Sequence, residues 1–174
     1  MDTQGQTWSP DQAYSTGSFG FIGAAASYAA SASALGTADP SLYATLRQAP
    51  LLTFKADLPN GNYRLVLHFA EWVASAPGQR LLKVSAEGVD LASNLDVYQQ
   101  TGAGRAYTLP ATVTVADGSL DLSVQGLSGR AMLAAVEVYG LNAIGVPTPT
   151  PTPTESPLQL ELTLPSNAKL LGTP

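Results

Sequence analysis

The stretch from Asn62 to Glu71 constrains the fold of this chain more than any other segment. In an extended chain, successive side chains point to opposite faces. One face of this stretch would carry Tyr63, Leu65, Leu67 and Phe69, and the other Arg64, Val66, His68 and Ala70. Pro59-Asn60-Gly61 before it and Pro77-Gly78 after it are residue types that form tight turns. We therefore predict a turn-bounded strand with one face fully buried, lying at the centre of a sheet.

Further short stretches with strand-like composition surround this central strand. We expect strands at 42–47, 51–56, 81–86, 89–98 with a break near Asn94, 106–116, 120–125 and 131–139. Asp117-Gly118 fits a two-residue hairpin turn, and Pro110 indicates a bend or a sheet edge because proline cannot donate a ladder hydrogen bond. Many short strands separated by turns predict an all-β antiparallel β-sandwich. Residues 24–34 are rich in Ala, but the Ser and Gly among them favour a packed loop.

The composition excludes several classes of function. Only 12% of residues are charged and the net charge is −5, which is a poor match to nucleic acid or to an anionic membrane. There is no cysteine and only one histidine, so no ordinary zinc site can form. No cofactor is expected. A structural Ca²⁺ stays open, although no Asp-x-Asp motif supports it. Residues 19–36 lack the large apolar side chains of a membrane span, so we expect no membrane insertion.

The C-terminal part changes character after Val146. We divide the chain into a folded domain at 1–146, a Pro-Thr linker at 147–157 and an amphipathic strand at 158–174, where Leu158, Leu160, Leu162 and Leu164 alternate with polar residues. An isolated strand is unstable alone. It either begins a truncated second domain or is donated to the sheet edge of a neighbouring copy. The low charge, the many hydroxyls and the Pro-Thr tract favour a secreted bacterial protein at the cell surface or outside the cell.

Signals for catalysis are weak. A Ser-His-Asp triad would have to use His68, which lies within the central strand, and no Gly-x-Ser-x-Gly elbow is present. Paired carboxylates for glycoside hydrolysis stay open because the chain has 13 acidic residues. A sandwich of this size, however, seldom supplies a deep catalytic cleft. We predict that the protein is not an enzyme.

A set of short motifs points to a known family. In chain order they are Trp8-x-x-Asp11-x-x-Tyr14, Leu42-Tyr43-x-Thr45-x-Arg47, Pro59-Asn60-Gly61-x-Tyr63, Leu67-His68-Phe69-Ala70-Glu71, Gly78-Gln79-Arg80, Asp96-Val97, Val115-x-Asp117-Gly118-x-Leu120 and Ala135-Val136-Glu137-Val138. Over residues 7–140 the chain resembles a malectin-type carbohydrate-binding domain. The resemblance implies a jelly-roll-like β-sandwich of the galactose-binding-like type. It also implies a ligand site in loops at one end, binding of glucose-type oligosaccharides and no catalysis.

The resemblance also implies where sugar-facing aromatics would lie. Tyr43 and Tyr28 match two of the family's aromatic positions, and Trp72 lies one position before a third, at which the family's aromatic pair is replaced by Val73-Ala74. In the family, an acidic residue of the sugar site lies before the last strand, and the corresponding position in this sequence falls near Gly129. An aromatic ring can stack on the flat C–H face of a pyranose, while polar neighbours bind its hydroxyls.

The candidate carbohydrate-binding residues are therefore Tyr43, Trp72, Tyr28, Arg47 and Glu71. Arg47 and Glu71 are next to the aromatics in sequence and serve either to bind hydroxyls or to form internal ion pairs that fix the strands. We expect Trp8, Asp11 and Tyr14 to tie the N-terminal segment to the core.

Two functional hypotheses follow. The first is a secreted, non-catalytic module that binds a glucan-type oligosaccharide or polysaccharide through rim loops. The second is a structural subunit of an extracellular filament or assembly, in which residues 158–164 are donated to the sandwich of a neighbouring copy.

Overall fold

The computed structural model describes residue 3 and residues 7–141. Within these residues nearly all regular structure is β, which confirms the predicted all-β class. The elements are β1 (Phe19–Ile22), β2 (Ala26–Ala29), the 3₁₀ helix η1 (Pro40–Tyr43), β3 (Thr45–Ala49), β4 (Leu51–Asp57), β5 (Gly61–Ala70), β6 (Leu81–Ala86), β7 (Val89–Leu95), α1 (Val97–Thr101), β8 (Ala106–Val115), β9 (Ser119–Ser128), β10 (Ala131–Leu133) and β11 (Ala135–Leu141). The predicted linker at 147–157 and strand at 158–174 lie outside the described residues.

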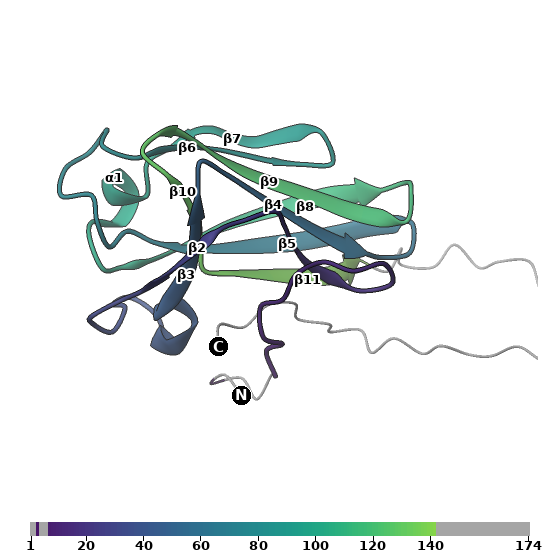
Figure 1. Cartoon of the computed structure of the whole chain (residues 1–174), viewed down its shortest axis with the longest axis horizontal. Helices are drawn as coiled ribbons and strands as arrows, with labels where there is room; N and C mark the ends of the chain where they lie inside the picture. The colour runs from purple at the N-terminus through teal and green to yellow at the C-terminus, as the bar shows by residue number, and fades with distance from the viewer. Residues whose placement is uncertain (1–2, 4–6, 142–174) are drawn as a thin grey trace, which may run out of the picture.

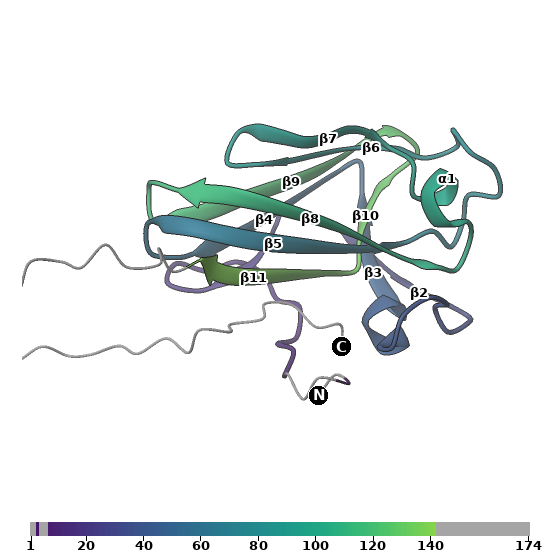
Figure 2. The same cartoon turned by 180° about the vertical axis from the view of Figure 1, so that it is seen from behind.

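Two antiparallel sheets form the sandwich. A five-stranded sheet has the order β1-β4-β9-β6-β7, and a three-stranded sheet has the order β11-β5-β8. Figures 1 and 2 show these sheets as two layers. A third sheet, β10-β3-β2, crosses the end of the sandwich at which α1 also lies, at the left of Figure 1. We call this end the rim. It is where the candidate residues Tyr28 and Arg47 lie, on β2 and β3.

The predicted central strand is β5. It pairs with β11 on one side and with β8 on the other, so it is the middle strand of its sheet. Leu65, Leu67 and Phe69 on its inner face are 0% exposed and pack in the core between the layers. Fully burying a side chain of this size stabilises the fold by about 1.5–3 kcal/mol, so the alternating pattern fixes which face of β5 turns inward. Pro110 lies in the edge strand β8, as the sequence predicts.

The segment predicted as a strand at 42–47 is divided in two. Pro40–Tyr43 forms η1, and β3 begins only at Thr45. Pro40 at the start of η1 has its φ fixed near the helical value and lacks the N–H that a helix start leaves unpaired, which favours a helical turn over a strand there. The Ala-rich segment predicted as a loop contains β2, which pairs with β3.

The strand predicted at 89–98 ends earlier than expected. β7 stops at Leu95, and the Asp96 side chain accepts a hydrogen bond from the backbone N–H of Gln99 at the start of α1. An aspartate in this position is a good helix N-cap, because its carboxylate satisfies an N–H that has no partner within the helix.

The last strand changes sheets at the rim. β10 pairs with β3, whereas β11 pairs with β5 from Ala135 onward. At the bend, the Ala134 N–H donates to the carbonyl oxygen of His68 at 2.9 Å. The rim sheet is therefore tied to the end of the central strand.

Candidate functional site

The structure brings two of the predicted residues together in a groove at the rim. Tyr28 on β2 and Arg47 on β3 belong to paired strands and both contribute to the lining of one cavity of about 180 Å³. The register pairs Tyr28 with Leu46 and Arg47 with Ser27, so the two side chains point to opposite faces of the rim sheet. The cavity extends to the edge strand β1 of the large sheet. Its remaining lining is mostly apolar and comprises Asp11, Phe21, Ile22, Ala25, Ser27, Ala29, Thr45, Leu46, Leu52, Thr53, Phe54, Leu133 and Ala134. We call this cavity the rim groove.

Arg47 is held in place by three contacts. Its guanidinium lies over the Phe21 ring, 3.6 Å from the ring centroid. Its Nε donates to the Asp11 carboxylate, and its Nη1 donates to the carbonyl oxygen of Ala25 at 3.3 Å. The ion pair ties the N-terminal segment to β3, and an internal ion pair is one of the two roles that the sequence leaves open for Arg47. A guanidinium has five N–H donors, so these two hydrogen bonds leave capacity for a ligand.

The rim groove also contains a hydroxyl that is not used internally. Thr45 Oγ1 is buried and has no hydrogen-bond partner among the described residues. A buried polar group without a partner costs about 1–3 kcal/mol. The oxygen is buried, so a ligand in the groove reaches it only if a neighbouring side chain moves.

Tyr43 lies elsewhere, below a second cavity on the outer face of the β11-β5-β8 sheet. It is 2% exposed, and its Oη lies 2.8 Å from His68 Nδ1. Burial, followed by the charge of Glu137, raises the pKa of the Tyr43 phenol to about 12. The hydroxyl therefore stays protonated at ordinary pH.

We expect this buried tyrosine to make stability decrease in strong alkali. The folded pKa lies above the ordinary pKa of 10.0, so the Tyr43 contribution is complete below about pH 10 and is lost as the pH rises through about 12. Denaturant unfolding should show Tyr43→Phe less stable than the wild type at about pH 8, by about 1–3 kcal/mol, since His68 Nδ1 loses its partner. The difference should shrink above about pH 10. A difference that stays constant over this pH range would contradict this assignment.

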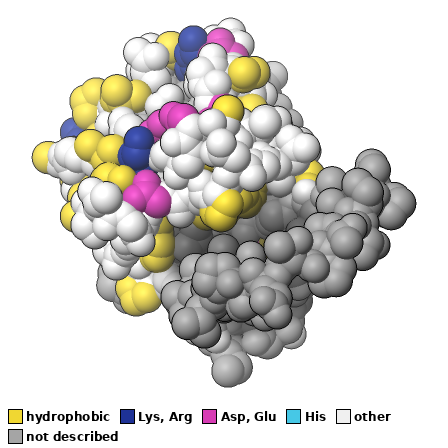
Figure 3. All heavy atoms as spheres, turned by 90° about the vertical axis from the view of Figure 1, so that its right-hand side faces the viewer, with side chains coloured by type: hydrophobic (Ala, Val, Ile, Leu, Met, Phe, Trp, Pro, Cys, Tyr) yellow, Lys and Arg dark blue, Asp and Glu magenta, His cyan; other side chains and the backbone are white. Residues whose placement is uncertain are grey.

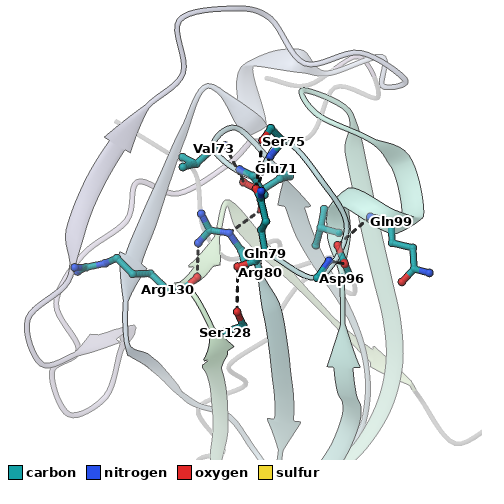
Figure 4. A network of polar contacts seen from close by, with 12 residues as sticks. Glu71, Val73, Ser75, Gln79, Arg80, Asp96, Gln99, Ser128 and Arg130 are labelled. Carbon is teal, nitrogen blue, oxygen red and sulfur yellow. Dashed lines mark hydrogen bonds and ion pairs between the residues drawn. The ribbon is translucent and has the colours of Figure 1, made fainter.

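Glu71 is part of a buried brace. It is 1% exposed, its Oε2 lies 2.7 Å from Arg80 Nε, and its Oε1 accepts from the backbone N–H groups of Val73 and Ala74 at 2.8 Å each. Arg80 in turn donates to the carbonyl oxygen of Arg130. Figure 4 shows Arg80 between Glu71 and Arg130. Of the two roles left open for Glu71, the structure shows the ion pair, which joins the end of β5 to two rim loops.

Trp72 packs against the chain near Gly104. A Cβ placed at Gly104 would lie 3.2 Å from Trp72 Cζ3, so only glycine leaves the ring its full room. The backbone at Gly104 also has φ +66°, which favours glycine. The Trp72 side chain is half-buried and is not among the residues that line the rim groove. The five predicted residues thus fall into three places: Tyr28 and Arg47 in the lining of the rim groove, Glu71 and Trp72 side by side at the end of β5, and Tyr43 below the second cavity.

Comparison with known proteins identifies the family. The model of the Malectin domain matches residues 1–144, which is most of the chain. The chain belongs to the malectin domain family. Domains of this family are carbohydrate-binding modules that generally lack catalytic activity. No match was found among curated proteins.

Solved structures share the fold of this malectin domain. A β-glucuronidase from Bacteroides uniformis is 26% identical with a TM-score of 0.72, and the alignment covers 80% of this chain and 16% of that enzyme. The malectin domain therefore matches only a small part of the enzyme. The extracellular domain of ANXUR2 from Arabidopsis thaliana is 16% identical with a TM-score of 0.63, covering 74% of this chain and 42% of that one. The ANX1 ectodomain from the same plant is 18% identical with a TM-score of 0.59, covering 67% and 38%.

Several residues that shape the sites of this malectin domain were not predicted as such from the sequence. Phe21 and Thr45 line the rim groove without a local pattern that signals it, and Asp11 was predicted only as a tether. Among residues 3 and 7–141, no group of three or more His, Cys, Asp or Glu side chains could hold a metal ion.

Proposed function

We propose that this malectin domain is a non-catalytic module that binds neutral, glucan-type oligosaccharides in the rim groove. Family membership supports carbohydrate binding in general. The observation that supports this particular site is an aromatic residue and a charged pair in the lining of one mostly apolar cavity: Tyr28, and Arg47 with Asp11.

The chemistry of the groove matches the two sides of a pyranose ring. The C–H face of a sugar stacks on an aromatic ring, and Tyr28 supplies a half-buried one. The sugar hydroxyls need both donors and acceptors. Arg47 supplies donors and the Asp11 carboxylate supplies acceptors. A mostly apolar pocket with a few placed polar groups is the usual form of a small-molecule site.

We further propose that the module acts outside a bacterial cell, as one part of a longer secreted or surface-attached protein. Two observations support an extracellular domain: related folds occur in ectodomains, and the sequence is poor in charge and rich in hydroxyls. In the part of the chain that the structure describes, no helix has the length and apolar character needed to cross a membrane. Figure 3 shows a few Lys and Arg side chains on the visible face, lying beside Asp and Glu side chains and forming no large patch of one sign.

Replacing Tyr28 by alanine tests the site. Loss of a stacked ring should weaken binding of maltotriose, cellotriose or laminaritriose by about 1–2 kcal/mol, which is roughly tenfold in Kd, as measured by calorimetric titration. Tyr98→Ala is the matched control, because Tyr98 is also half-buried but lies on α1 and is not among the residues lining the groove. Equal affinity of the two variants for whichever sugar the wild type binds would refute the site.

The second hypothesis, assembly by donation of residues 158–164, stays a prediction because that segment lies outside the described residues. It has a direct test. Deleting residues 147–174 should convert polymers into monomers, as measured by light scattering. Monomers of the folded domain both with and without the tail would exclude it.

A further inference from the structure

The outer face of the β11-β5-β8 sheet carries a cleft that shares no lining residue with the rim groove. Its volume is about 630 Å³, within the range of about 300–1,000 Å³ that is usual for ligand sites. The cross-strand pairs Arg64–Tyr139, Val66–Glu137 and His68–Thr108 form its floor, and the segment that contains η1 forms a wall. We call this the sheet cleft.

The floor of the sheet cleft carries buried polar side chains at positions where apolar side chains would pack equally well. His68 and Glu137 are 6% and 7% exposed. Tyr43 Oη lies 2.8 Å from His68 Nδ1, His68 Nε2 lies 3.0 Å from Glu137 Oε1, and the Tyr139 hydroxyl donates to Glu137 Oε2. A carboxylate can only accept, so His68 Nε2 carries a proton and donates it to Glu137. The Trp8 ring meets His68 edge-on at 5.6 Å and helps to hold the imidazole in this orientation.

Such a network costs more to bury than well-packed apolar side chains of the same size, so packing alone does not account for it. What it does supply is a fixed carboxylate and a fixed ring at the bottom of an open cleft. This is the preorganisation that a binding site needs.

The charges around the cleft select the class of ligand. Arg64 is the only Lys or Arg among the described residues that line the cleft, and Asp39 and Glu137 are the acids. Asp39 already accepts two hydrogen bonds from Thr3, and Glu137 accepts from His68 and Tyr139. Thr37 and Thr108 add hydroxyls. This mixture of donors and acceptors suits the hydroxyls of a neutral sugar, whereas an anionic sugar would meet two carboxylates and one guanidinium.

We propose that the sheet cleft is a second saccharide site, which binds a neutral sugar with Glu137 and Arg64 contacting its hydroxyls and the half-buried Tyr139 ring lying beside it. The proposal deepens the proposed function and rests on it. Two separate sites on one module would let it bridge two stretches of a polysaccharide, or hold one chain with higher avidity.

Amide chemical shifts measured during titration with maltotriose, cellotriose and laminaritriose test the proposal. For a sugar that binds, we expect two separate groups of shifting amides, one around residues 26–29 and 45–47 and one around 64–68, 106–108 and 137–140. Thr108→Trp places a large ring in the cleft from an exposed strand position. It should weaken the sugar affinity fitted from the second group of amides by about tenfold and leave the affinity fitted from the first group unchanged. Arg64→Gln, also exposed, should weaken the affinity fitted from the second group in the same direction without a new bulky group.

The outcomes separate the two proposals. If sugar-induced shifts occur only at the rim groove and are the same in Thr108→Trp and Arg64→Gln as in the wild type, the second site is refuted and the proposed function stands. If shifts occur only at the sheet cleft and ignore Tyr28→Ala, the cleft is a saccharide site and the rim assignment fails. If glucuronic acid binds the cleft more tightly than the neutral sugars do, the proposed ligand class is refuted. If no sugar shifts any amide at millimolar concentration, both proposals fail.

Discussion

Replacing Glu71 by glutamine should lower the free energy of unfolding by about 3–5 kcal/mol, because it leaves Arg80 as a buried charge without its partner. Glu71 and Arg80 are 1% and 6% exposed, so water cannot compensate for the lost carboxylate. The same carboxylate accepts two backbone N–H groups from the loop that follows β5. Denaturant unfolding followed by tryptophan fluorescence or circular dichroism measures the loss directly.

A surface ion pair supplies the control. Lys83 and Asp90 form a pair in which the two side chains are 40% and 43% exposed. Asp90→Asn should cost no more than about 1 kcal/mol, since solvent screens exposed pairs. Replacing Glu71 by glutamine and Arg80 by methionine together should recover part of the loss, because the glutamine oxygen still accepts the two backbone N–H groups and no buried charge is left unpaired. If the Glu71→Gln protein were as stable as the Asp90→Asn protein, the buried Glu71–Arg80 ion pair would not be important for the stability of the rim.

Alanine at Gly126 is expected to destabilise the fold by about 2–4 kcal/mol through a steric clash. A Cβ at this position would lie 2.4 Å from the carbonyl oxygen of Gly129 and 2.8 Å from the backbone nitrogen of Ala131. Both atoms belong to the backbone where the chain passes from β9 to β10, so no side chain can rotate away. The pairing register of β6 with β9 is already irregular beside Gly126, between Leu81 and Leu82.

Gly118 is the matched control for this substitution. It has φ +84°, and a Cβ placed there would meet nothing within 4 Å, so Gly118→Ala adds backbone strain without a clash. That strain costs about 1–2 kcal/mol. Thermal or denaturant unfolding should therefore show that the Gly126→Ala protein is less stable than the Gly118→Ala protein. The reverse order would mean that the loop between β9 and β10 adapts freely.

The sequence was most informative where local pattern and burial coincide. The alternation from Tyr63 to Phe69 predicted β5, its inner face and its central place, because a strand with one apolar face has one stable way to lie in a sandwich. Pro110 predicted an edge for a similar reason, since only an edge strand tolerates a residue that cannot donate.

Partnerships between distant residues were not visible in the sequence. Arg47 pairs with Asp11 and Glu71 pairs with Arg80, and no local rule chooses those partners over other acids and bases. The contacts of Tyr43 were also not visible in the sequence, for a second reason. Pro40 starts a helical turn where a strand was expected, and this turn places Tyr43 beside His68 rather than at the rim groove. Proximity in sequence to the Arg47 strand was therefore a poor guide to proximity in space.

The structure of the chain crystallised with a bound neutral glucose trisaccharide tests the central claim most directly. We predict a pyranose ring stacked on Tyr28 in the rim groove, with a hydroxyl within hydrogen-bond distance of the Arg47 guanidinium or the Asp11 carboxylate. The account would be contradicted if the rim groove were empty and the sugar were bound only at the opposite end of the sandwich, where the Asp117-Gly118 turn joins β8 and β9.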